Sequence, residues 1–412
     1  MKNKMHFEEW INYLISQHPV EIDMGLSRVR EVAKRLNLLN LGETKIITVA
    51  GTNGKGTTCA FLENIFLNAN YQVGVYSSPH LLKFNERVRI NNRNATDDQL
   101  IEAFKQIELA REEITLTFFE YSTLSALYVF KQQAVDIVLL EVGLGGRLDA
   151  TNMIDANIAV LTSIGLDHQE YLGNTRESVG IEKVGVCRKE RPAIIGEPEV
   201  PHAVKQRLKE IGANTYFVGD DFNSFDESNH WSFNGLRVIN NIPAPQLPLQ
   251  NAVTAIQTAL MFDPTLTDEM IKSGVEQASL PGRMELVSQQ PKVYLDVAHN
   301  PQSAQYLKRQ LNKFEGKRVF ALCGMLKDKD IQSVIQCLQT EFYEWNLVSL
   351  DVSRGAESSE LAECFDSQQN INCFGDLNEA WANLKLKITD DDVVIVFGSF
   401  YTVAGFKKLK QG

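Results

Sequence analysis

The residues most open to a chemical interpretation form a glycine-rich turn, Gly51-Thr52-Asn53-Gly54-Lys55-Gly56-Thr57. An apolar run over 46–50 precedes the turn and indicates a buried strand, and the residues from 59 onward favour a helix. Backbone amides at the N-terminus of such a helix, together with its dipole, suit a polyphosphate. The turn therefore predicts a phosphate-binding loop.

Two side-chain types in this turn add to the prediction. Lys55 would reach the terminal phosphates, and a hydroxyl at Thr57 or Thr58 would ligate magnesium. The general pattern fits imperfectly, because Val49 stands where that pattern places a glycine and Gly56 separates Lys55 from the threonines. A plain structural loop remains the alternative.

Three further polar residues lie at or just beyond the ends of predicted strands at 72–76, 135–142 and 157–163: Ser78, Glu141 and His168. In open α/β sheets, ligands collect at the carboxyl ends of the strands. A carboxylate that ends an apolar strand is costly to bury without a cation, and magnesium beside ATP would supply one. An ordinary turn serine and a histidine satisfied by its neighbours are the open alternatives. Lys183, in a predicted helix at 177–187, is explained as readily by a solvated helix face.

Composition and length set limits on function. The chain has 412 residues and a net charge of −11, so it is long enough for two or three domains and lacks the basic character of a nucleic-acid-binding protein. Its six cysteines show no C-x-x-C spacing, which argues against a zinc site or a disulfide framework. No apolar run reaches about 18 residues, and acidic residues stand where a signal peptide would be apolar. We expect a soluble, cytoplasmic protein without membrane association.

Alternating strand and helix patterns organise the chain as an α/β protein with a parallel sheet. Besides the strands above, we expect strands at 45–50 and 192–196 and helices at 57–70, 97–112, 120–133 and 250–262. Residues 215–243 read as a hairpin insertion, and Ser279-Leu280-Pro281-Gly282-Arg283 reads as a domain boundary. A second series, with strands at 292–296, 318–323, 346–351 and 393–397, follows. The expected domains are 1–283 and 284–412, with a ligand crevice between them.

Six motifs together resemble those of folylpolyglutamate synthases, which belong to the Mur ligase superfamily. They are 51–57, Tyr76-Ser77-Ser78-Pro79-His80-Leu81, Glu141-Val142-Gly143-Leu144-Gly145-Gly146-Arg147-Leu148-Asp149, Leu166-Asp167-His168, Leu280-Pro281-Gly282-Arg283 and Asp296-Val297-Ala298-His299-Asn300-Pro301. They occur in the family's order, and the unusual Lys-Gly-Thr spacing is the family's own variant. The resemblance implies a Mur ligase-like fold: a P-loop NTPase domain with a parallel sheet, plus a smaller Rossmann-like C-terminal α/β domain.

The resemblance also implies roles for individual residues. Lys55, Lys183 and His168 would be catalytic. Two magnesium ions would be held by Ser78, Glu141, His168 and Lys183, the lysine as a carbamate, which turns a cation into an anion beside the metal. The implied ATP-binding residues are Thr52, Asn53, Gly54, Lys55, Gly56, Thr57, Asn251, Arg283, Asp296 and His299.

Some family members only extend folates, whereas bifunctional bacterial ones also join the first glutamate to dihydropteroate. Segments resembling the pterin-binding parts of the bifunctional type implicate Asp23, Met24, Gly25, Leu26, Thr117, Phe118, Phe119, Glu120, Leu148, Asp149 and Ala150. Met24 is a conservative departure from the usual leucine. Phe118 and Phe119 could equally be core aromatics.

The implied activity is that of a monomeric ATP-dependent ligase. ATP would phosphorylate the carboxylate of dihydropteroate or of a reduced folate, and L-glutamate would attack the acyl phosphate. The alternatives are a Mur-type ligase that adds an amino acid to a peptidoglycan precursor, and a nucleotide-dependent switch without ligase chemistry.

Overall fold

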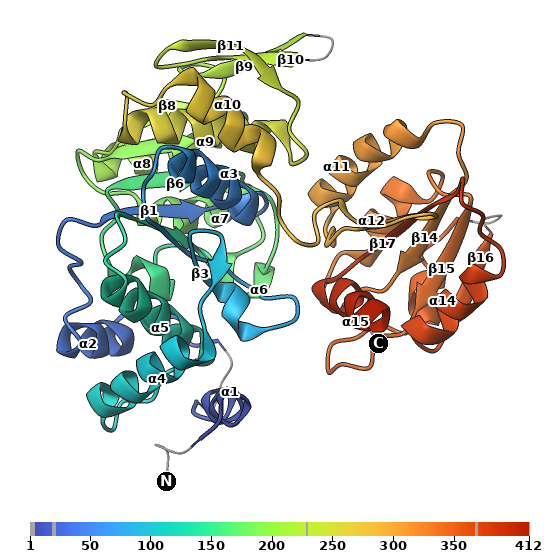
Figure 1. Ribbon diagram of the computed structural model, residues 1–412, viewed down its shortest axis with the longest axis horizontal. Coiled ribbons are helices and arrows are strands. Elements are labelled where there is room, and N and C mark those ends of the chain that lie inside the picture. The colour runs from blue at the N-terminus through green and yellow to red at the C-terminus, as the bar shows by residue number, and fades with distance from the viewer. Residues whose placement is uncertain (1–4, 19–21, 228–229, 367–369, 412) are drawn as a thin grey trace. The chain divides into compact units, whose positions relative to one another are not determined.

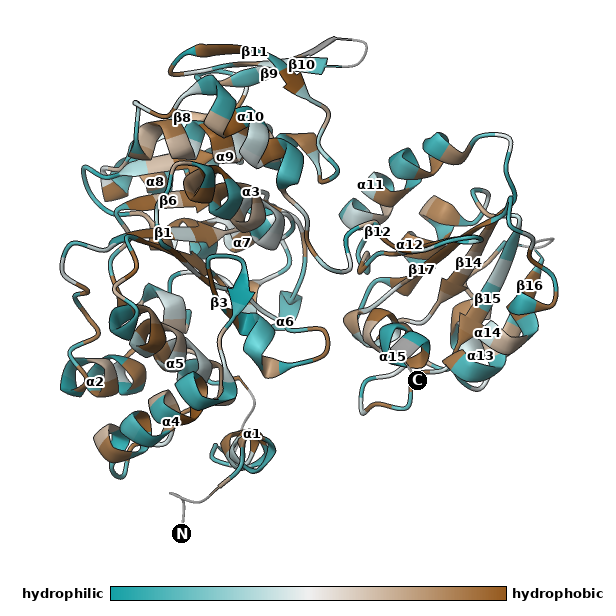
Figure 2. Cartoon of the chain, viewed as in Figure 1, coloured by the Kyte–Doolittle hydropathy of each residue, from teal (hydrophilic) through white to brown (hydrophobic). Residues whose placement is uncertain are grey.

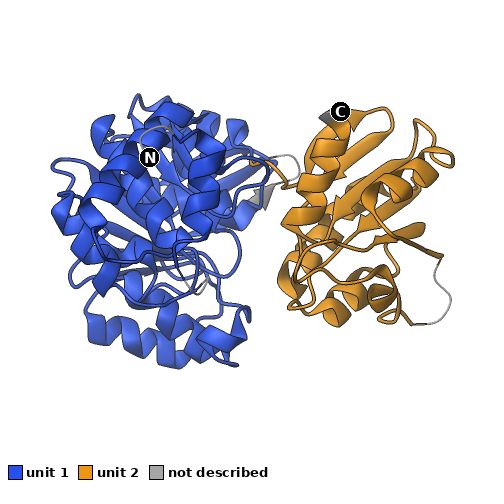
Figure 3. Cartoon of the chain, turned by 90° about the horizontal axis from the view of Figure 1, so that it is seen from below, with its two compact units in different colours: residues 1–279 blue, residues 280–412 orange. Residues whose placement is uncertain are grey.

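The computed structural model describes residues 5–18, 22–227, 230–366 and 370–411. The chain divides into two compact units, Met1–Ser279 and Leu280–Gly412, so the division falls at 279/280 where the sequence suggested 283/284 (Figures 1 and 3). Among the described residues, no helix combines the length and the apolar character needed to cross a membrane.

An eight-stranded sheet in the order β4-β3-β2-β5-β1-β6-β7-β8 forms the centre of unit 1. All neighbours pair in parallel except β2 with β3 and β3 with β4, so the sheet is mixed where a parallel one was predicted. Residues 77–87 join β2 to β3, and they are too few for the crossover of a dozen or more residues that a parallel pair requires. The strands are β1 (Lys45–Ala50), β2 (Val73–Tyr76), β3 (Val88–Ile90), β4 (Arg93–Asn94), β5 (Ile137–Glu141), β6 (Ile158–Leu161), β7 (Pro192–Ile195) and β8 (Asn214–Phe217).

Helices cover both faces of this sheet (Figure 1). On one face α3 packs against β1, β2 and β5, and α9 packs against β6 and β7. On the other face α5 contacts β2 and is flanked by α1, α2 and α4. The helices of unit 1 are α1 (Phe7–Ile15), α2 (Ser27–Arg35), α3 (Lys55–Asn68), α4 (Asp97–Arg111), α5 (Phe118–Gln132), α6 (Gln169–Leu172), α7 (Arg176–Lys183), α8 (His202–Ile211), α9 (Leu249–Phe262) and α10 (Asp268–Gln277).

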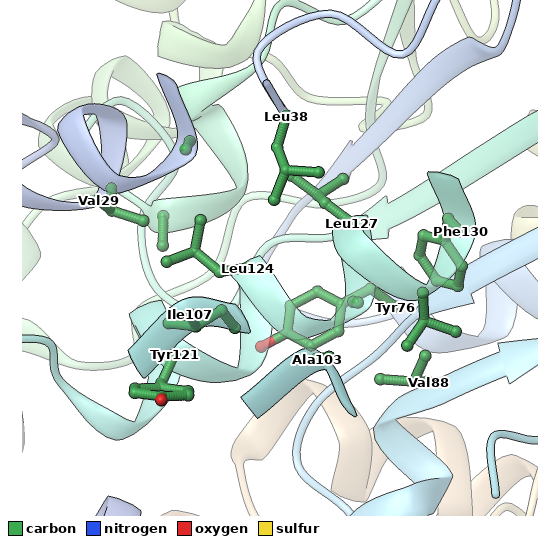
Figure 4. Packing of buried hydrophobic residues seen from close by; sticks show 14 of the residues in the cluster. Val29, Leu38, Tyr76, Val88, Ala103, Ile107, Tyr121, Leu124, Leu127 and Phe130 are labelled. Atoms are coloured by element: carbon green, nitrogen blue, oxygen red, sulfur yellow. The ribbon is translucent and has the colours of Figure 1, made fainter. Parts of the chain in front are cut away.

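A buried apolar cluster joins the second helical layer to the sheet (Figure 4). Tyr76 of β2 and Val88 of β3 meet Leu124, Leu127 and Phe130 of α5 there. Trp10 and Leu14 of α1 are also buried in the cluster. This packing holds the first turn of α5 close to the ends of β2 and β5.

The region expected to be a hairpin, 215–243, is built differently. Its first residues belong to β8, the edge strand of the main sheet. The rest forms a separate three-stranded antiparallel sheet of β9 (Asn223–Glu227), β10 (His230–Asn234) and β11 (Val238–Pro243). Residues 228–229 lie outside the described part of the chain. Trp231 and Phe233 of β10 are buried, whereas Phe225 of β9 is exposed.

Unit 2 is a second α/β domain with a six-stranded sheet in the order β12-β13-β17-β14-β15-β16. Only β12 and β13 pair antiparallel. In both units the strands are largely hydrophobic, and the helices turn hydrophilic residues outward (Figure 2). The elements of unit 2 are β12 (Glu285–Gln289), β13 (Lys292–Leu295), β14 (Val319–Cys323), β15 (Glu344–Val348), β16 (Ile371–Phe374), β17 (Val393–Phe397), α11 (Pro301–Leu311), α12 (Ile331–Leu338), α13 (Ser358–Ala362), α14 (Leu377–Lys385) and α15 (Phe400–Gln411). All six cysteines are free.

Candidate active site

The glycine-rich turn joins β1 to α3, and two of its glycines are required by its shape. Gly51 has φ +151° and Gly54 has φ +86°, conformations that favour glycine. A Cβ at Gly51 would lie 1.9 Å from Thr162 Oγ1, and one at Gly54 would lie 2.5 Å from Asn251 Oδ1. The second contact places Asn251, in the first turn of α9, directly against the loop, and its nucleotide role remains a prediction.

Hydrogen bonds fix the loop to the segment that follows β6. The Thr52 amide donates to the Ser163 carbonyl over 3.0 Å, and the Thr52 hydroxyl donates to the Gly165 carbonyl over 2.8 Å. The Asn53 amide donates to Ser163 Oγ over 3.0 Å. The amides of Thr52 and Asn53 therefore hold the loop in shape, and the N-terminal turn of α3, from Lys55 onward, is the part aimed at a ligand.

The Lys55 side chain folds back onto the loop. Its Nζ donates to the carbonyls of Gly51 and Thr52 over 2.9 and 3.1 Å. Of the two candidate hydroxyls, Thr58 Oγ1 is shut off from solvent, and Thr58 is wholly buried, whereas Thr57 keeps a small exposed fraction. Thr57 is therefore the better placed for a magnesium ion.

Strand register brings Ser78 and Glu141 together. Glu141 pairs with Val49 of β1, and Leu140 pairs with Tyr76, so both β2 and β5 end beside the loop. The Ser78 amide donates to Glu141 Oε2 over 3.3 Å, and Glu141 is only 6% exposed. A buried carboxylate and a serine at one strand edge match the chemistry of a magnesium site.

His168 lies further along the same edge, past the end of β6. It takes a left-handed conformation, φ +50°, before the short helix α6, and its side chain is 39% exposed. Its Nε2 lies 4.0 Å from Asp167 Oδ2. Within the described residues, no three His, Cys, Asp or Glu side chains gather closely enough to hold a metal ion by themselves.

Lys183 ends α7 and is buried, so the solvated-face alternative for this residue is wrong. Gly146 explains how the helix end comes so close to the site, because a Cβ there would lie 2.7 Å from the Lys183 carbonyl. Burial is the main reason that the pKa of Lys183 falls to about 7, and the positive charge of Lys55 lowers it further. Asp167 and Asp149 act on it in the opposite direction. The two predicted catalytic lysines thus share one electrostatic environment.

The three segments predicted to bind pteroate lie together. The Arg28 guanidinium joins two of them: its Nη1 is 2.7 Å from Asp23 Oδ2 and its Nη2 is 3.1 Å from Glu120 Oε1. The third segment, 148–150, is tied to the turn after β5, because the Asp149 carboxylate accepts from the amides of Gly143 and Leu144. In that turn a Cβ at Gly143 would meet the Phe119 ring at 2.6 Å, and one at Gly145 would lie 3.8 Å from Met24 Cε.

The residues of these segments differ in how far their side chains are exposed and in how many hydrogen bonds they make within the protein. Asp149 is bound internally, because its carboxylate accepts from the amides of Gly143, Leu144 and Thr151 and from the Thr151 hydroxyl. Its burial nevertheless raises its pKa. Thr117 and Glu120 form the capping box of α5, and Ala150 is buried in the core. Gly25 and Leu26, just before α2, and Leu148 are partly exposed. Phe118 and Phe119 are also only partly buried, so they pack on the core and still present a surface.

Two residues with evident roles here were not foreseen. Arg28 holds Asp23 and Glu120 together, and Asp167 acts electrostatically on Lys183. The only available signal for Arg28 was its position just after Asp23-Met24-Gly25-Leu26. Such a signal does not reveal a partner that lies 92 residues away.

In unit 2, Asp296 follows β13 and is buried. Its carboxylate accepts from the amides of Met284 and Ala298 over 3.0 and 2.8 Å, while burial raises its pKa and Arg283 opposes that shift. The His299 ring bonds to the Val297 carbonyl over 2.7 Å. These residues are rigidly held at the carboxyl end of β13, and their nucleotide roles remain predictions.

The sequence matches known ligases over nearly its whole length. Residues 49–234 match the Mur ligase middle domain, and residues 282–400 match the Mur ligase glutamate ligase domain. Over 96% of this chain and 93% of the relative, the sequence is 44% identical to a dihydrofolate synthase/folylpolyglutamate synthase of Escherichia coli (strain K12). The chain belongs to the dihydrofolate synthase/folylpolyglutamate synthase family of Mur ligases.

Solved structures of this family share the fold throughout. Escherichia coli FolC in complex with DHPP and ADP is 42% identical, with a TM-score of 0.95 over 99% of this chain and 98% of that one. A bifunctional folylpolyglutamate synthase/dihydrofolate synthase with Mn, AMPPNP and L-glutamate bound is 45% identical, with a TM-score of 0.93 over 99% of each chain. The family fold predicted from the motifs is therefore confirmed. The relatives that match are of the bifunctional type, as the sequence motifs predicted.

Proposed function

We propose that this protein is an ATP-dependent ligase that joins L-glutamate to dihydropteroate and also extends reduced folates with glutamate. One observation carries the proposal: the phosphate loop with Lys55 shares an electrostatic environment with buried Lys183, in the same unit that gathers the three pteroate segments. The names and bound ligands of the relatives support the choice of nucleotide, acid and amino acid.

The residues fit ATP and a divalent metal ion. The N-terminal turn of α3 and Lys55 suit the phosphates, and Glu141 with Ser78 and Thr57 supplies the hard oxygen ligands that magnesium prefers. His168 and Lys183 are proposed to complete two metal sites. When bound, magnesium neutralises phosphoryl oxygens and orients them for in-line transfer.

The chain itself positions the reactants. Lys55 is proposed to turn from the Gly51 and Thr52 carbonyls to the terminal phosphate, where its charge stabilises the transferring phosphoryl group. The substrate carboxylate displaces ADP and becomes an acyl phosphate. The glutamate amine then attacks the acyl carbon and phosphate leaves, so no nucleophilic side chain is needed. Exclusion of water protects the acyl phosphate until the amine arrives.

Lys183 is proposed to act as a carbamate. Its pKa of about 7 leaves much of the amine neutral near neutral pH, which is the form that adds to carbon dioxide. Addition forms a nitrogen–carbon bond and releases the amine proton, and the product carries a carboxylate-like pair of oxygens. A buried ammonium beside Lys55 would repel a metal ion, whereas a carbamate attracts it. We further propose that the enzyme works as a monomer in the cytoplasm.

The test is a parallel assay of the purified protein with ATP, magnesium and three acid substrates. Dihydropteroate and tetrahydrofolate should each give a glutamylated product with L-glutamate, and a UDP-linked muramyl precursor should give none. Product from the muramyl precursor alone would favour the peptidoglycan ligase. Phosphate release that is indifferent to all three acids would favour a nucleotide switch.

A further inference from the structure

Two arginines near the end of β2 differ in how their charges are neutralised. Arg89 in β3 is paired with a carboxylate, since its Nη2 lies 2.9 Å from Glu63 Oε2, and its Nη1 donates to Ser77 Oγ over 3.0 Å. Arg87, two residues earlier, is only 8% exposed and makes no ion pair with any carboxylate of the described residues. The charge of Arg89 is thus neutralised within the protein, whereas that of Arg87 has no carboxylate of the described chain in ion-pair contact.

The side chains that hydrogen-bond to Arg87 are neutral. Its Nε donates to His80 Nδ1 over 2.7 Å, and the Tyr76 hydroxyl lies beside the guanidinium. The carboxylate of Glu86 is taken up by the amides of 81–83. Buried charges in folded proteins are normally paired, because the desolvation of an unpaired ion is costly. A guanidinium placed this way suits an anion that arrives with a ligand.

The position of Arg87 indicates which ligand. Its guanidinium lies 5.2 Å from the centroid of the Phe118 ring and 5.9 Å from that of Phe84, so aromatic faces hold its plane. Phe118 opens α5 in the proposed pteroate site, and Glu141, the predicted metal ligand, also acts electrostatically on Arg87. Arg87 thus stands between the residues proposed for the aromatic body of the substrate and those proposed for the metal and phosphate.

His80 offers a second donor at this place. Because an arginine Nε can only donate, His80 Nδ1 must be the acceptor, and the hydrogen of the neutral ring is on Nε2. A forked guanidinium with a neighbouring N–H group matches the geometry of a carboxylate, which accepts on two oxygens.

We propose that Arg87 binds the carboxylate of the acid substrate, the group that ATP phosphorylates, with the hydrogen bond to His80 fixing the orientation of the guanidinium. This inference rests on the proposed function. Arg87 would offset the repulsion between the carboxylate and the phosphates of ATP, and it would hold one carboxylate oxygen toward the phosphate loop.

The experiment compares dihydropteroate with an analogue in which aniline takes the place of p-aminobenzoate, so that only the carboxylate is missing. Binding of both to the full-length protein is measured without turnover, in the presence of magnesium and ADP. Wild-type protein should prefer dihydropteroate by about 10- to 100-fold, the range expected for a charge-assisted contact. Arg87→Met should bind both compounds with nearly equal affinity, and Arg87→Lys should keep part of the preference.

An Arg87→Met protein that retains the wild-type preference would overturn the inference. So would a rise in the KM for ATP with an unchanged preference, because the guanidinium would then serve the nucleotide. Wild-type protein that prefers dihydropteroate but forms no dihydrofolate would instead contradict the proposed function, which keeps the two failures distinct.

Stability provides an independent readout. If Arg87 is held for a ligand, its removal relieves a buried cation that has no carboxylate in ion-pair contact among the described residues, and the melting temperature of Arg87→Met should equal or exceed that of the wild type. Arg89→Met, the matched control, should melt lower, because it leaves Glu63 buried without its partner. A loss of stability in Arg87→Met as large as that in Arg89→Met would show a structural role and reject the inference.

Discussion

Replacement of Lys55 by methionine should abolish most of the activity while leaving the fold in place. Methionine fills a similar volume but cannot donate to a phosphate. Loss of a charge-stabilising donor to a transferring group typically removes about 3 kcal/mol of transition-state stabilisation. At 1.36 kcal/mol for each factor of ten, this corresponds to a fall of about 150-fold in the rate of dihydrofolate formation.

The structure also bounds the loss of stability. Lys55 Nζ makes two hydrogen bonds, to the carbonyls of Gly51 and Thr52, from a partly buried position. The cost of losing them is about 1 to 3 kcal/mol, and relief of the repulsion between Lys55 and Lys183 offsets part of it. Because Lys55 lowers the pKa of Lys183, the variant should also need a higher pH for carbamylation of Lys183.

Dihydrofolate is measured chromatographically at saturating ATP, dihydropteroate and L-glutamate. Lys45→Met is the matched control, since Lys45 begins the same strand β1 but is exposed at the opposite end from the loop. The control should keep full turnover. Near-normal turnover of Lys55→Met at saturating ATP would refute the assignment of the phosphate loop.

Three other predictions concern the rest of the site. Glu141→Ala should raise the magnesium concentration needed for half-maximal activity by at least tenfold or abolish activity, and a magnesium titration that matches the wild type would remove Glu141 from the metal site. Lys183 should give a carbamate signal in carbon-13 NMR of protein equilibrated with labelled bicarbonate. Lys183→Ala should lack this signal and lose activity, and a high concentration of a small carboxylate should restore part of the activity. A wild-type protein that is active without the signal would contradict the carbamate. The pKa of Lys183 in the folded protein, about 7, is below the reference of about 10.4 for the unfolded chain, so the unfolded chain binds more protons between these two pH values. The free energy of unfolding of the unmodified protein should therefore rise from pH 7 to pH 10, which thermal or denaturant titrations measure.

Local patterns were sufficient to predict most of the central sheet. The apolar runs that became β1, β5 and β6 are buried on both faces, and such runs are distinctive in sequence. The expected helix at 97–112 is α4, whose Thr96 cap and Gln99 form a capping box. By contrast, β12 and β16 went unpredicted because their exposed and half-buried residues alternate too weakly to stand out.

The candidate site was predictable where a residue ends a buried strand. Ser78 and Glu141 follow from that rule alone, because strand order then brings them together. Lys183 did not follow, since its burial depends on the close approach permitted by Gly146, far away in sequence. Only the family resemblance indicated a role for it. Arg87 was missed because a buried arginine and a surface arginine look alike in sequence.

The central claim is that the chain joins L-glutamate to dihydropteroate through an acyl phosphate. The most direct measurement uses dihydropteroate labelled with oxygen-18 in its carboxylate, together with ATP, magnesium and L-glutamate. The claim predicts dihydrofolate, with one labelled oxygen carried into the released phosphate in each turnover. Dihydrofolate formed with unlabelled phosphate would contradict the acyl phosphate, and release of phosphate without dihydrofolate would contradict the ligase activity itself.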